Sequence, residues 1–519
     1  KNGRFFFFFF IFIVLNRILG LIATSFISSK SLDMITLLLC IVIGCVVLWR
    51  RCKKDSATLT LPPKYPGELP FIGHAHMFFG DSARLWTKIK EITAECINKG
   101  GVIHFYLGAD LYYAIADPDD ILKVSNACLQ KHYAYQFAKS WLGDGLGTAS
   151  GEVWQRHRKL LSPAFSLPVV HNFLGVFNSQ ARKMVEDIAV HTNKGQCDHS
   201  VFMRKMASET FCMTAFGIDG MTKNALEKYI KALDETLSIV VKRFQQFWLH
   251  SDVIYQFSGL KRRADEMVKL LNSISEDVIQ RKKAFIKLGE CLILLTDVKH
   301  KALLDLMLGL SADNTFTDKE MREEMDSAIA AGSDTTSNLL TCLIVLMGDH
   351  QEIQERMYME LIQVLGTERD ISKENLQKLV YMEAVIKETL RYIPTTPIIL
   401  RYVDKNVQLK NYTLRAGSQC AILLVGALWD PSWGDDVGHF RPERWLDPAS
   451  LPPNPNTFAA FSLGKRNCIG KSYALTLTKV TLAHFFMAYR VTSDLSNFKL
   501  KLDFILKPMS GYEINLRRR

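Results

Sequence analysis

The segment FSLGKRNCIG, residues 461–470, places one cysteine between two glycines, with an arginine two positions ahead of it. A cysteine thiolate can bind haem iron and donate electron density that favours cleavage of an O–O bond. The residues that follow, KSYALTLTKVTLAHFFMAY, have the composition of a helix. Cys468 is therefore predicted to lie just before a helix N-terminus, where backbone N–H groups and the helix dipole stabilise a thiolate.

The neighbours of Cys468 suit a flat, anionic macrocycle. Gly464 allows a tight turn, and Gly470 allows the following helix to approach the ring. Arg466 is placed to meet a carboxylate of the ring, and Phe461 to pack beneath it. Burial as a packing residue is the ordinary interpretation of a cysteine, and we apply it to the other ten.

The segment is similar to the haem-binding signature F-x-x-G-x-R-x-C-x-G of the cytochrome P450 superfamily, whose other landmarks occur in order along the chain. The resemblance implies that family's fold, a large helical domain with a small β-sheet region. Finer similarity, best seen in GLGTASGEVWQRHRKLLSPAF, is to the microsomal family-four group of insects and vertebrates. Many members of that group bond haem through a glutamate where this chain has Ala331. We therefore expect haem b bound without covalent attachment apart from the Cys468 thiolate.

An ionic network is implied by two more motifs. ETLR places Glu388 and Arg391 three residues apart on one helix face, where they can pair. FRPERW resembles the family's P-E-R-F segment and supplies Arg444 as the third member of the network. In the family this network is buried and supports the cysteine loop, so its expected role here is structural.

Arginines outside the cysteine loop are expected to bind the haem carboxylates. GEVWQRHR places Trp154 and Arg158 on one helix face and is similar to the family's W-x-x-x-R, whose residues hydrogen-bond a propionate. Arg401 in PTTPIILR stands where the family has another propionate-binding arginine. Arg158, Arg401 and Arg466 would together compensate a buried dianion. A surface cation–π contact between Trp154 and Arg158 is the alternative.

The segment AGSDTTS, residues 331–337, resembles the family's oxygen-binding A-G-x-D-T-T and lies in a predicted helix, Asp318–Met347. Gly332 is expected to leave space for O₂ between this helix and the iron. Thr335 is expected to hydrogen-bond the oxygen molecule, and Asp334 to relay protons from solvent. A break between two helices is the alternative, because glycine and threonine are poor helix formers.

The resemblance implies a haem-thiolate monooxygenase, which inserts one oxygen atom of O₂ into an apolar molecule. Electrons are expected from NADPH through the membrane-bound cytochrome reductase, and cytochrome b5 is a second candidate partner. A basic proximal face on a chain of net charge +11 would suit an acidic partner. The expected pocket walls are mostly apolar and predict a lipophilic substrate, such as a fatty acid, hormone, odorant or xenobiotic. These walls are Phe137, Trp141, Leu146, Ala328, Ile329, Thr396–Ile399 and the turn at Met509.

Other functions are compatible with a haem-thiolate site. A haem-thiolate isomerase or dehydratase needs no activation of O₂, and a membrane-tethered haem sensor or carrier needs no shaped pocket. The pair Asp334 and Thr335 counts against both, because neither function needs a proton relay. An inactive gene product is a third alternative.

The elements that position these residues are predicted to be mainly α-helical. Helical periodicity and short strand-like runs predict one domain over residues 75–519 with one small sheet. The strand-like runs are VIHFYLG, YYAIAD and CAILLVGAL. The predicted helices are Asp81–Lys99, Val169–His191, Ala225–Ser251, Arg262–Ile286, Asp318–Met347 and Lys373–Tyr392.

Composition excludes two further classes of protein. The eleven cysteines show no C-x-x-C or zinc-finger spacing, so neither a disulfide framework nor a structural zinc site is indicated. Most Lys and Arg residues alternate with Asp and Glu, without the basic, aromatic runs of a nucleic-acid-binding surface. We therefore expect no nucleic-acid partner.

The N-terminal region predicts a membrane anchor. MITLLLCIVIGCVVLW is followed at once by RRCKK, so residues 34–54 are expected to anchor the chain in the endoplasmic reticulum membrane, with the catalytic domain cytoplasmic. PPKYPGELPFIGH predicts a proline-rich hinge over 55–74. Residues 1–33 contain a phenylalanine run and no methionine. We expect them to be a gene-model artefact, with a native start at Met34; a two-helix hairpin is the alternative.

Overall fold

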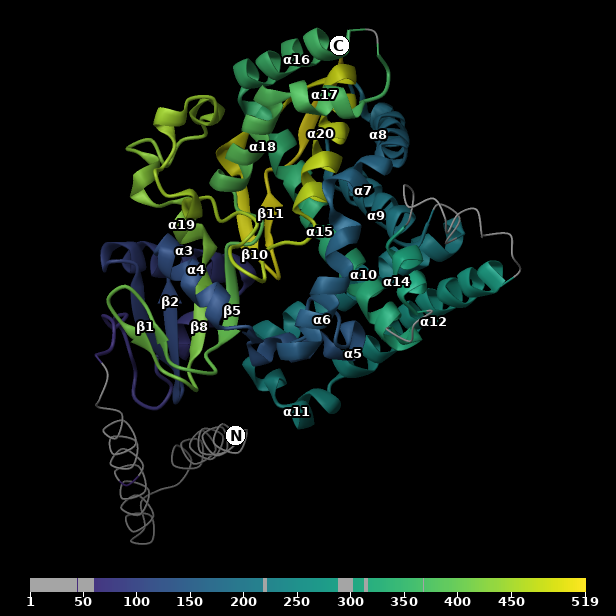
Figure 1. The fold of residues 1–519 in the computed structure, drawn as a ribbon. Coiled ribbons are helices and arrows are strands. Elements are labelled where there is room, and N and C mark those ends of the chain that lie inside the picture. Colours follow the sequence, from purple (N-terminus) through teal and green to yellow (C-terminus); the bar gives the residue numbers. More distant parts are fainter. Residues whose placement is uncertain (1–43, 45–59, 218–221, 288–301, 312–315, 367) are drawn as a thin grey trace, which may run out of the picture.

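The computed structural model describes residues 44, 60–217, 222–287, 302–311, 316–366 and 368–519. The predicted extension 1–33 and anchor 34–54 lie outside the described residues, except for Gly44. The rest forms a mainly helical domain with small sheets, as predicted (Figure 1). Its helices are α3 (Ser82–Asn98), α4 (Pro118–Ala127), α5 (Lys139–Leu142), α6 (Gly151–Leu161), α7 (Leu167–Asn172), α8 (Leu174–Ile188), α9 (Ser200–Phe216), α10 (Lys223–Gln245), α11 (Asp252–Gln256), α12 (Gly259–Lys287), α14 (Leu303–Ser311), α15 (Asp318–Asp349), α16 (Gln351–Leu365), α17 (Lys373–Lys378), α18 (Val380–Tyr392), α19 (Leu424–Leu428) and α20 (Lys471–Ala488).

The described part contains four sheets, so the prediction of one sheet is wrong. The largest has the strand order β1-β2-β8-β5-β3, in which β2 and β8 run parallel and the other neighbours antiparallel. Its strands are β1 (Val102–Leu107), β2 (Asp110–Ile115), β3 (Gln130–Lys131), β5 (Ile398–Tyr402) and β8 (Gln419–Leu423). The smaller sheets are β4-β12-β9, β10-β11 and β6-β7. Their strands are β4 (Gln196–Cys197), β6 (Val407–Gln408), β7 (Thr413–Leu414), β9 (Tyr489–Thr492), β10 (Lys499–Leu502), β11 (Leu506–Ser510) and β12 (Ile514–Arg518). Strands this short contain too few alternations to stand out in a sequence.

Several predicted elements are interrupted. The predicted helix Lys373–Tyr392 breaks at Leu379, because the carboxylate of Glu360 accepts the N–H groups of Tyr381 (2.6 Å) and Met382 (2.9 Å) and so caps a new helix start. The predicted helix Val169–His191 breaks between α7 and α8.

Two other predicted elements end early. The predicted helix Ala225–Ser251 ends as α10 at Gln245, and a 3₁₀ turn follows. The run CAILLVGAL is strand only to Leu423 and continues as α19, where a Cβ on Gly426 would lie 2.5 Å from that of Ala116. An apolar run of this length does not distinguish strand from buried helix.

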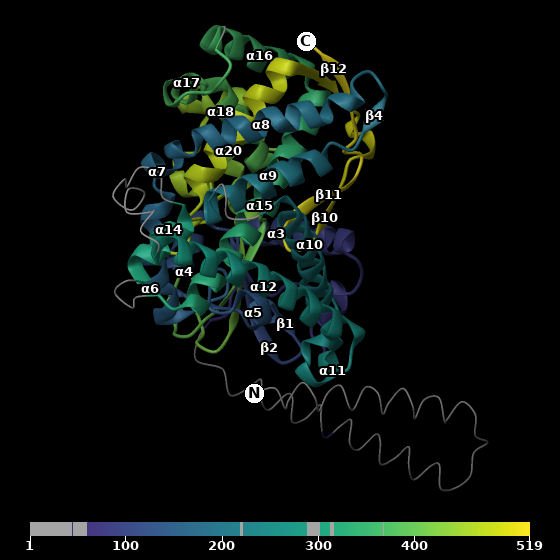
Figure 2. The same cartoon turned by 90° about the vertical axis from the view of Figure 1, so that its right-hand side faces the viewer.

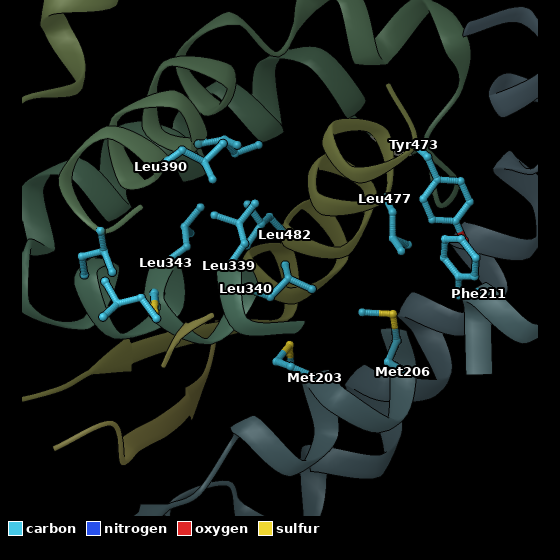
Figure 3. Packing of buried hydrophobic residues seen from close by; sticks show 14 of the residues in the cluster. Met203, Met206, Phe211, Leu339, Leu340, Leu343, Leu390, Tyr473, Leu477 and Leu482 are labelled. Carbon is cyan, nitrogen blue, oxygen red and sulfur yellow. The ribbon is translucent and has the colours of Figure 1, made fainter. Parts of the chain in front are cut away.

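Helix α15 is the centre of the core. Thr317 and Glu320 form a reciprocal capping box at its start. It runs without a break through AGSDTTS, so the alternative of two helices is wrong. It packs beside α9 and α20, and α8 covers these two (Figure 2). Figure 3 shows how Met203, Phe211, Leu340 and Leu477 from α9, α15 and α20 meet in this core.

Within the described part, α15 alone is long and apolar enough to cross a membrane. Of its most apolar 18-residue window, 83% is buried inside the fold. It is therefore the central helix of the core, and burial among its neighbours accounts for its apolar composition.

The described part of the predicted hinge, residues 60–74, lies against β1. Tyr65 N–H donates to the carbonyl of His104 (2.9 Å), and His104 N–H donates to that of Pro63 (2.9 Å). The ring of His74 hydrogen-bonds the Tyr65 carbonyl at 2.8 Å and is fully buried. These residues are thereby joined to the edge of the largest sheet.

Candidate functional site

The cysteine loop is a tight turn that ends at the N-terminus of α20. Gly464 has φ +71°, and a Cβ there would lie 2.8 Å from Asn126 Oδ1, so both conformation and space favour glycine. Cys468 N–H donates to the carbonyl of Phe461 (2.8 Å), which closes the loop. Gly470 is the N-cap of α20. A Cβ at Gly470 would meet no described atom within 4 Å, so protein packing does not explain this glycine.

Among the seven cysteines that the structure describes, Cys468 alone is exposed. Desolvation raises the pKa of the thiol, and the Gly470 N–H and the positive charges of Arg158 and Lys471 oppose this rise. A coordinating metal ion would shift the balance to the thiolate.

Two predicted carboxylate-binding arginines flank the cysteine. Arg158 donates two hydrogen bonds of 2.8 Å to Asn467, one to its carbonyl and one to its side-chain oxygen. Arg466 donates to the carbonyl of Ala149 at 2.7 Å. The guanidinium of Arg466 also lies 4.3 Å from the ring centroid of Trp154. The cation–π partner of Trp154 recorded in the structure is thus Arg466, and not Arg158.

A cluster of three cations lies beside this loop: Arg401 and Arg466 are buried, and Lys131 is half-buried with its Nζ 4.2 Å from the ring centroid of Tyr135. Arg401 on β5 is 2% exposed and Arg466 is 9% exposed. Lys131 on β3 is the register partner of Arg401. Burial, followed by the charges of Arg401 and Arg466, lowers the pKa of Lys131 well below its usual value. Burial and the charge of Arg401 lower the pKa of Arg466 to about 9.

These cations have no acidic counterpart in the described part of the chain. No described carboxylate forms an ion pair with Lys131, Arg401 or Arg466, and the Nε atoms of both arginines have no hydrogen-bond partner there. Unpaired buried charges are strongly unfavourable. A ligand with two carboxylates, such as haem, fits this cluster. Lys131 was not expected from the sequence, because only the pairing of β3 with β5 reveals it.

Replacing Lys131 with methionine should have opposite effects on the two forms of the protein. Without haem, removal of an uncompensated half-buried cation should raise the free energy of unfolding by about 1 kcal/mol. With haem, the same change should accelerate haem loss severalfold. Thermal unfolding and haem transfer to apomyoglobin measure the two effects. Lys123→Met on α4, where the lysine side chain is 50% exposed, is the control and should change neither; equal behaviour of the two variants would contradict the cluster's role.

Helix α15 carries Asp334 and Thr335, the residues expected to deliver protons, and places Asp334 in a series of ion pairs. Asp334 is 9% exposed, and its Oδ1 accepts a hydrogen bond from Lys507 Nζ on β11 at 2.7 Å. Arg204 on α9 lies 3.8 Å from the same oxygen and pairs with Asp234, and these two side chains are each 37% exposed. The chain of charges therefore leads from the surface to Asp334. Thr335 Oγ1 donates to the carbonyl of Ala331 at 2.6 Å.

One face of α15 is accessible although the helix is mostly buried. Its members are spaced at helical intervals: Ala328, Ala331, Gly332 and Thr335. Ile329, expected to line the pocket, is fully buried, because it lies one position round the helix from this face. The predicted wall residue Trp141 is also buried, at 1% exposed.

The structure gives Gly332 a packing role that differs from the expected one. A Cβ at this position would lie 2.0 Å from a ring carbon of Phe211 on α9. Glycine is therefore required for the close contact of α15 with α9. The expected role of Gly332 in leaving space for O₂ stays a prediction beside this packing role.

The three residues of the expected ionic network meet in one place. Glu388 and Arg391 are both completely buried, as is Arg444. Glu388 Oε1 accepts from Arg391 Nη2 (2.8 Å), Arg444 Nε (3.1 Å) and the N–H of Arg441 (3.0 Å). Its Oε2 accepts from Arg391 Nε (2.9 Å) and Trp445 Nε1 (3.0 Å). Arg391 also donates to the carbonyls of residues 437 and 439, so the network joins α18 to the segment 433–445.

Comparison with known families matches residues 63–516 to the model described as Cytochrome P450. This chain belongs to the cytochrome P450 family. It is similar to Cytochrome P450 4V2 of Mus musculus, at 29% identity over 88% of this chain and 90% of that protein. It is also similar to two Drosophila melanogaster proteins. Probable cytochrome P450 312a1 is 30% identical over 89% of this chain and 93% of that protein. Cytochrome P450 4d2 is 27% identical over 94% of this chain and 100% of that protein.

Membership fixes the class of this cytochrome P450's cofactor and reaction. The protein is a haem monooxygenase with a cysteine thiolate ligand. Cys468 has the loop geometry and the exposed thiol, and the cation cluster has the charge, that such a haem needs. The resemblance to the family inferred from the sequence is confirmed.

Proposed function

We propose that this cytochrome P450 hydroxylates a lipophilic small molecule, such as a fatty acid, hormone, odorant or xenobiotic, with electrons from NADPH. The main support is the exposed thiol of Cys468, held at the N-terminus of α20 by a closed loop. When bound, the haem would supply the activation of O₂. Cys468 would hold the iron, and Lys131, Arg401 and Arg466 would compensate the carboxylates.

The chain's own contribution to the reaction is proton delivery. Asp334 is held by Lys507 and, at longer range, by Arg204, so the carboxylate keeps one orientation in which it can receive a proton from the surface. Thr335 follows Asp334 in the sequence and lies on the accessible face of α15. Rotation of the Thr335 hydroxyl away from the Ala331 carbonyl would let Oγ1 accept one proton and donate another.

Replacing Thr335 with alanine should uncouple NADPH oxidation from product formation. Loss of a positioned proton donor should lower product formation about a hundredfold. NADPH oxidation should continue and yield hydrogen peroxide, so the ratio of peroxide to product is the measurement. Thr341→Ala is the control, because Thr341 makes the same bond to the carbonyl four residues earlier on α15. An unchanged ratio in Thr335→Ala would exclude Thr335 from the relay.

The proposed function is tested with purified protein, reductase and NADPH. The ferrous–carbon monoxide spectrum should show thiolate ligation, and compounds that shift the spin state of the haem should be consumed in proportion to NADPH. A haem sensor or carrier would give the spectrum without coupled consumption. An isomerase would convert a substrate without NADPH. Either result would defeat the proposal.

An exposed apolar surface supports a location at the endoplasmic reticulum membrane, with the domain on the cytoplasmic side and cytochrome reductase and cytochrome b5 as partners. Two segments distant in sequence form this surface, and the rings of Phe79 and Phe247 lie 5.1 Å apart across it. Exposed apolar side chains that gather on one surface are typical of membrane contact. The two segments joined by this ring contact expose Leu69, Ile72, Phe79, Phe244, Trp248, Val253 and Phe257, which is 88% exposed.

A further inference from the structure

The buried carboxylate of Glu324 lies near the start of α15, three turns before the relay residues. The side chains of Glu324 and His157 are 2% and 1% exposed, and Glu324 Oε1 lies 2.6 Å from His157 Nδ1. Glu324 Oε2 accepts the N–H of Leu146 at 3.1 Å. One carboxylate thus joins α15 both to α6 and to the loop 143–149.

The hydrogen-bond partners define the direction of the His157 bond. Arg156 Nη2 lies 2.9 Å from His157 Nε2, and a guanidinium has only donors. The contact with Arg156 assigns His157 Nε2 as the acceptor, and Nδ1 is then the donor to Glu324; Glu320 Oε1 lies farther from Nε2, at 3.5 Å. Burial raises the pKa of Glu324, and the bonds from His157 and Leu146 oppose this rise. Both carboxylate oxygens are occupied by donors.

From each of these two hydrogen bonds, a series of contacts leads to the cysteine loop. The first path runs from His157 along the same turn of α6 to Arg158, which donates twice to Asn467. The second runs from Leu146 through the loop to Ala149, whose carbonyl accepts the Arg466 guanidinium at 2.7 Å. Asn467 and Arg466 are the two residues that precede Cys468.

The loop on the second path is rigid and close to α15. Ala149 N–H donates to the carbonyl of Gly145 at 2.8 Å, and Thr148 Oγ1 donates to that of Gly143 at 2.7 Å. A Cβ on Gly145 would lie 2.3 Å from Ser327 Oγ on α15. The loop therefore transmits the position of α15 to Ala149 with little freedom.

We propose, on the basis of the haem-thiolate function proposed above, that Glu324 is a positioning residue that fixes Arg158 and Arg466 relative to α15. It touches neither substrate nor haem. It sets the distance between the proximal cysteine loop and the helix that carries Asp334 and Thr335. Such support of a site by groups behind it determines whether the site is held in its productive geometry.

The test compares Glu324→Ala and Glu324→Gln with Asp326→Asn in the full-length holoprotein. Asp326 is a matched control on the same helix: it is fully buried and accepts bonds from Tyr229 (2.6 Å) and Ser275 (2.7 Å), which lie on α10 and α12 and not on α6. The readouts are the rate of haem transfer to excess apomyoglobin and the fraction of ferrous–carbon monoxide complex with thiolate ligation.

Glu324→Ala should transfer haem about tenfold faster than the unchanged protein, as expected for loss of a charge-assisted hydrogen bond, and should show a smaller thiolate fraction. Glu324→Gln should lie between them, because one amide oxygen can accept only one of the two N–H donors. Asp326→Asn should stay within about twofold. Where Glu324→Ala fails to fold, Glu324→Gln decides.

The proposal would be overturned if the Glu324 variants lost haem to apomyoglobin at the rate of the unchanged protein or at the rate of Asp326→Asn. Glu324 would then be one more buried carboxylate with no special effect on the cysteine loop. The unchanged protein provides the separate check on the function itself. A spectrum without thiolate ligation there would defeat the haem-thiolate assignment rather than the role of Glu324.

Discussion

Cys468→Ala will bind haem, if at all, without the spectrum of thiolate ligation, and monooxygenase activity will fall by at least about a thousandfold, or ~4 kcal/mol in the activation barrier. Electron donation by the thiolate promotes O–O cleavage, and a methyl group cannot replace it. The described part of the chain offers no other exposed thiol that could take over this role.

The control for this change is Cys197→Ala. Cys197 lies in β4, is 6% exposed and packs in the core, so its loss should cost about 1 kcal/mol or less and leave the spectrum intact. The carbon monoxide complex and the turnover of a screened substrate give the comparison. A thiolate spectrum in Cys468→Ala would show that another sulfur binds the iron, and the assignment of the site would fail.

Local sequence motifs were sufficient to predict the local structure around several candidate site residues. Gly464, Arg466 and Cys468 lie within one loop, and their spacing alone predicts the turn and the helix that follows. Thr335 and Asp334 lie on one continuous helix. These relations span few residues, so they are visible without knowledge of the tertiary fold.

Contacts between distant segments could not be predicted in this way. Lys131 joins the cation cluster only through the register of β3 with β5, and Lys507 reaches Asp334 from a strand 173 residues later in the chain. The packing role of Gly332 against Phe211, on another helix, could not be predicted for the same reason.

The ends of helices were also hard to predict from the sequence. A helix break leaves the apolar periodicity almost unchanged, so α17 and α18 read as one helix. Their separation depends on the carboxylate of Glu360 from α16, a tertiary contact. The sequence therefore predicts where helical segments lie better than it predicts where they end.

Glu388→Ala should be the most destabilising of the proposed changes. Arg391 and Arg444 are completely buried; Arg391 would lose its carboxylate partner, and Arg444 would keep only its pair with Asp436 at 3.2 Å. Removing one partner of a buried ionic network leaves an uncompensated charge and costs about 3–5 kcal/mol. This is a large fraction of the roughly 5–15 kcal/mol by which an ordinary domain is stable. We therefore expect little soluble, haem-loaded protein, measured by yield and by thermal unfolding.

Glu443→Gln is the control, because it removes a carboxylate from the same region without disturbing the buried network around Glu388. The Glu443 side chain is 42% exposed and accepts bonds from Arg356 (2.9 Å) and Tyr381 (2.7 Å), so its replacement should cost about 1 kcal/mol or less. Glu388→Gln, which keeps the shape of the side chain, should lie between the two. If Glu388→Ala proved as stable as Glu443→Gln, the backbone carbonyls and the Asp436 carboxylate would be sufficient to hold Arg391 and Arg444. The segment 433–445 would then not depend on the network for its position.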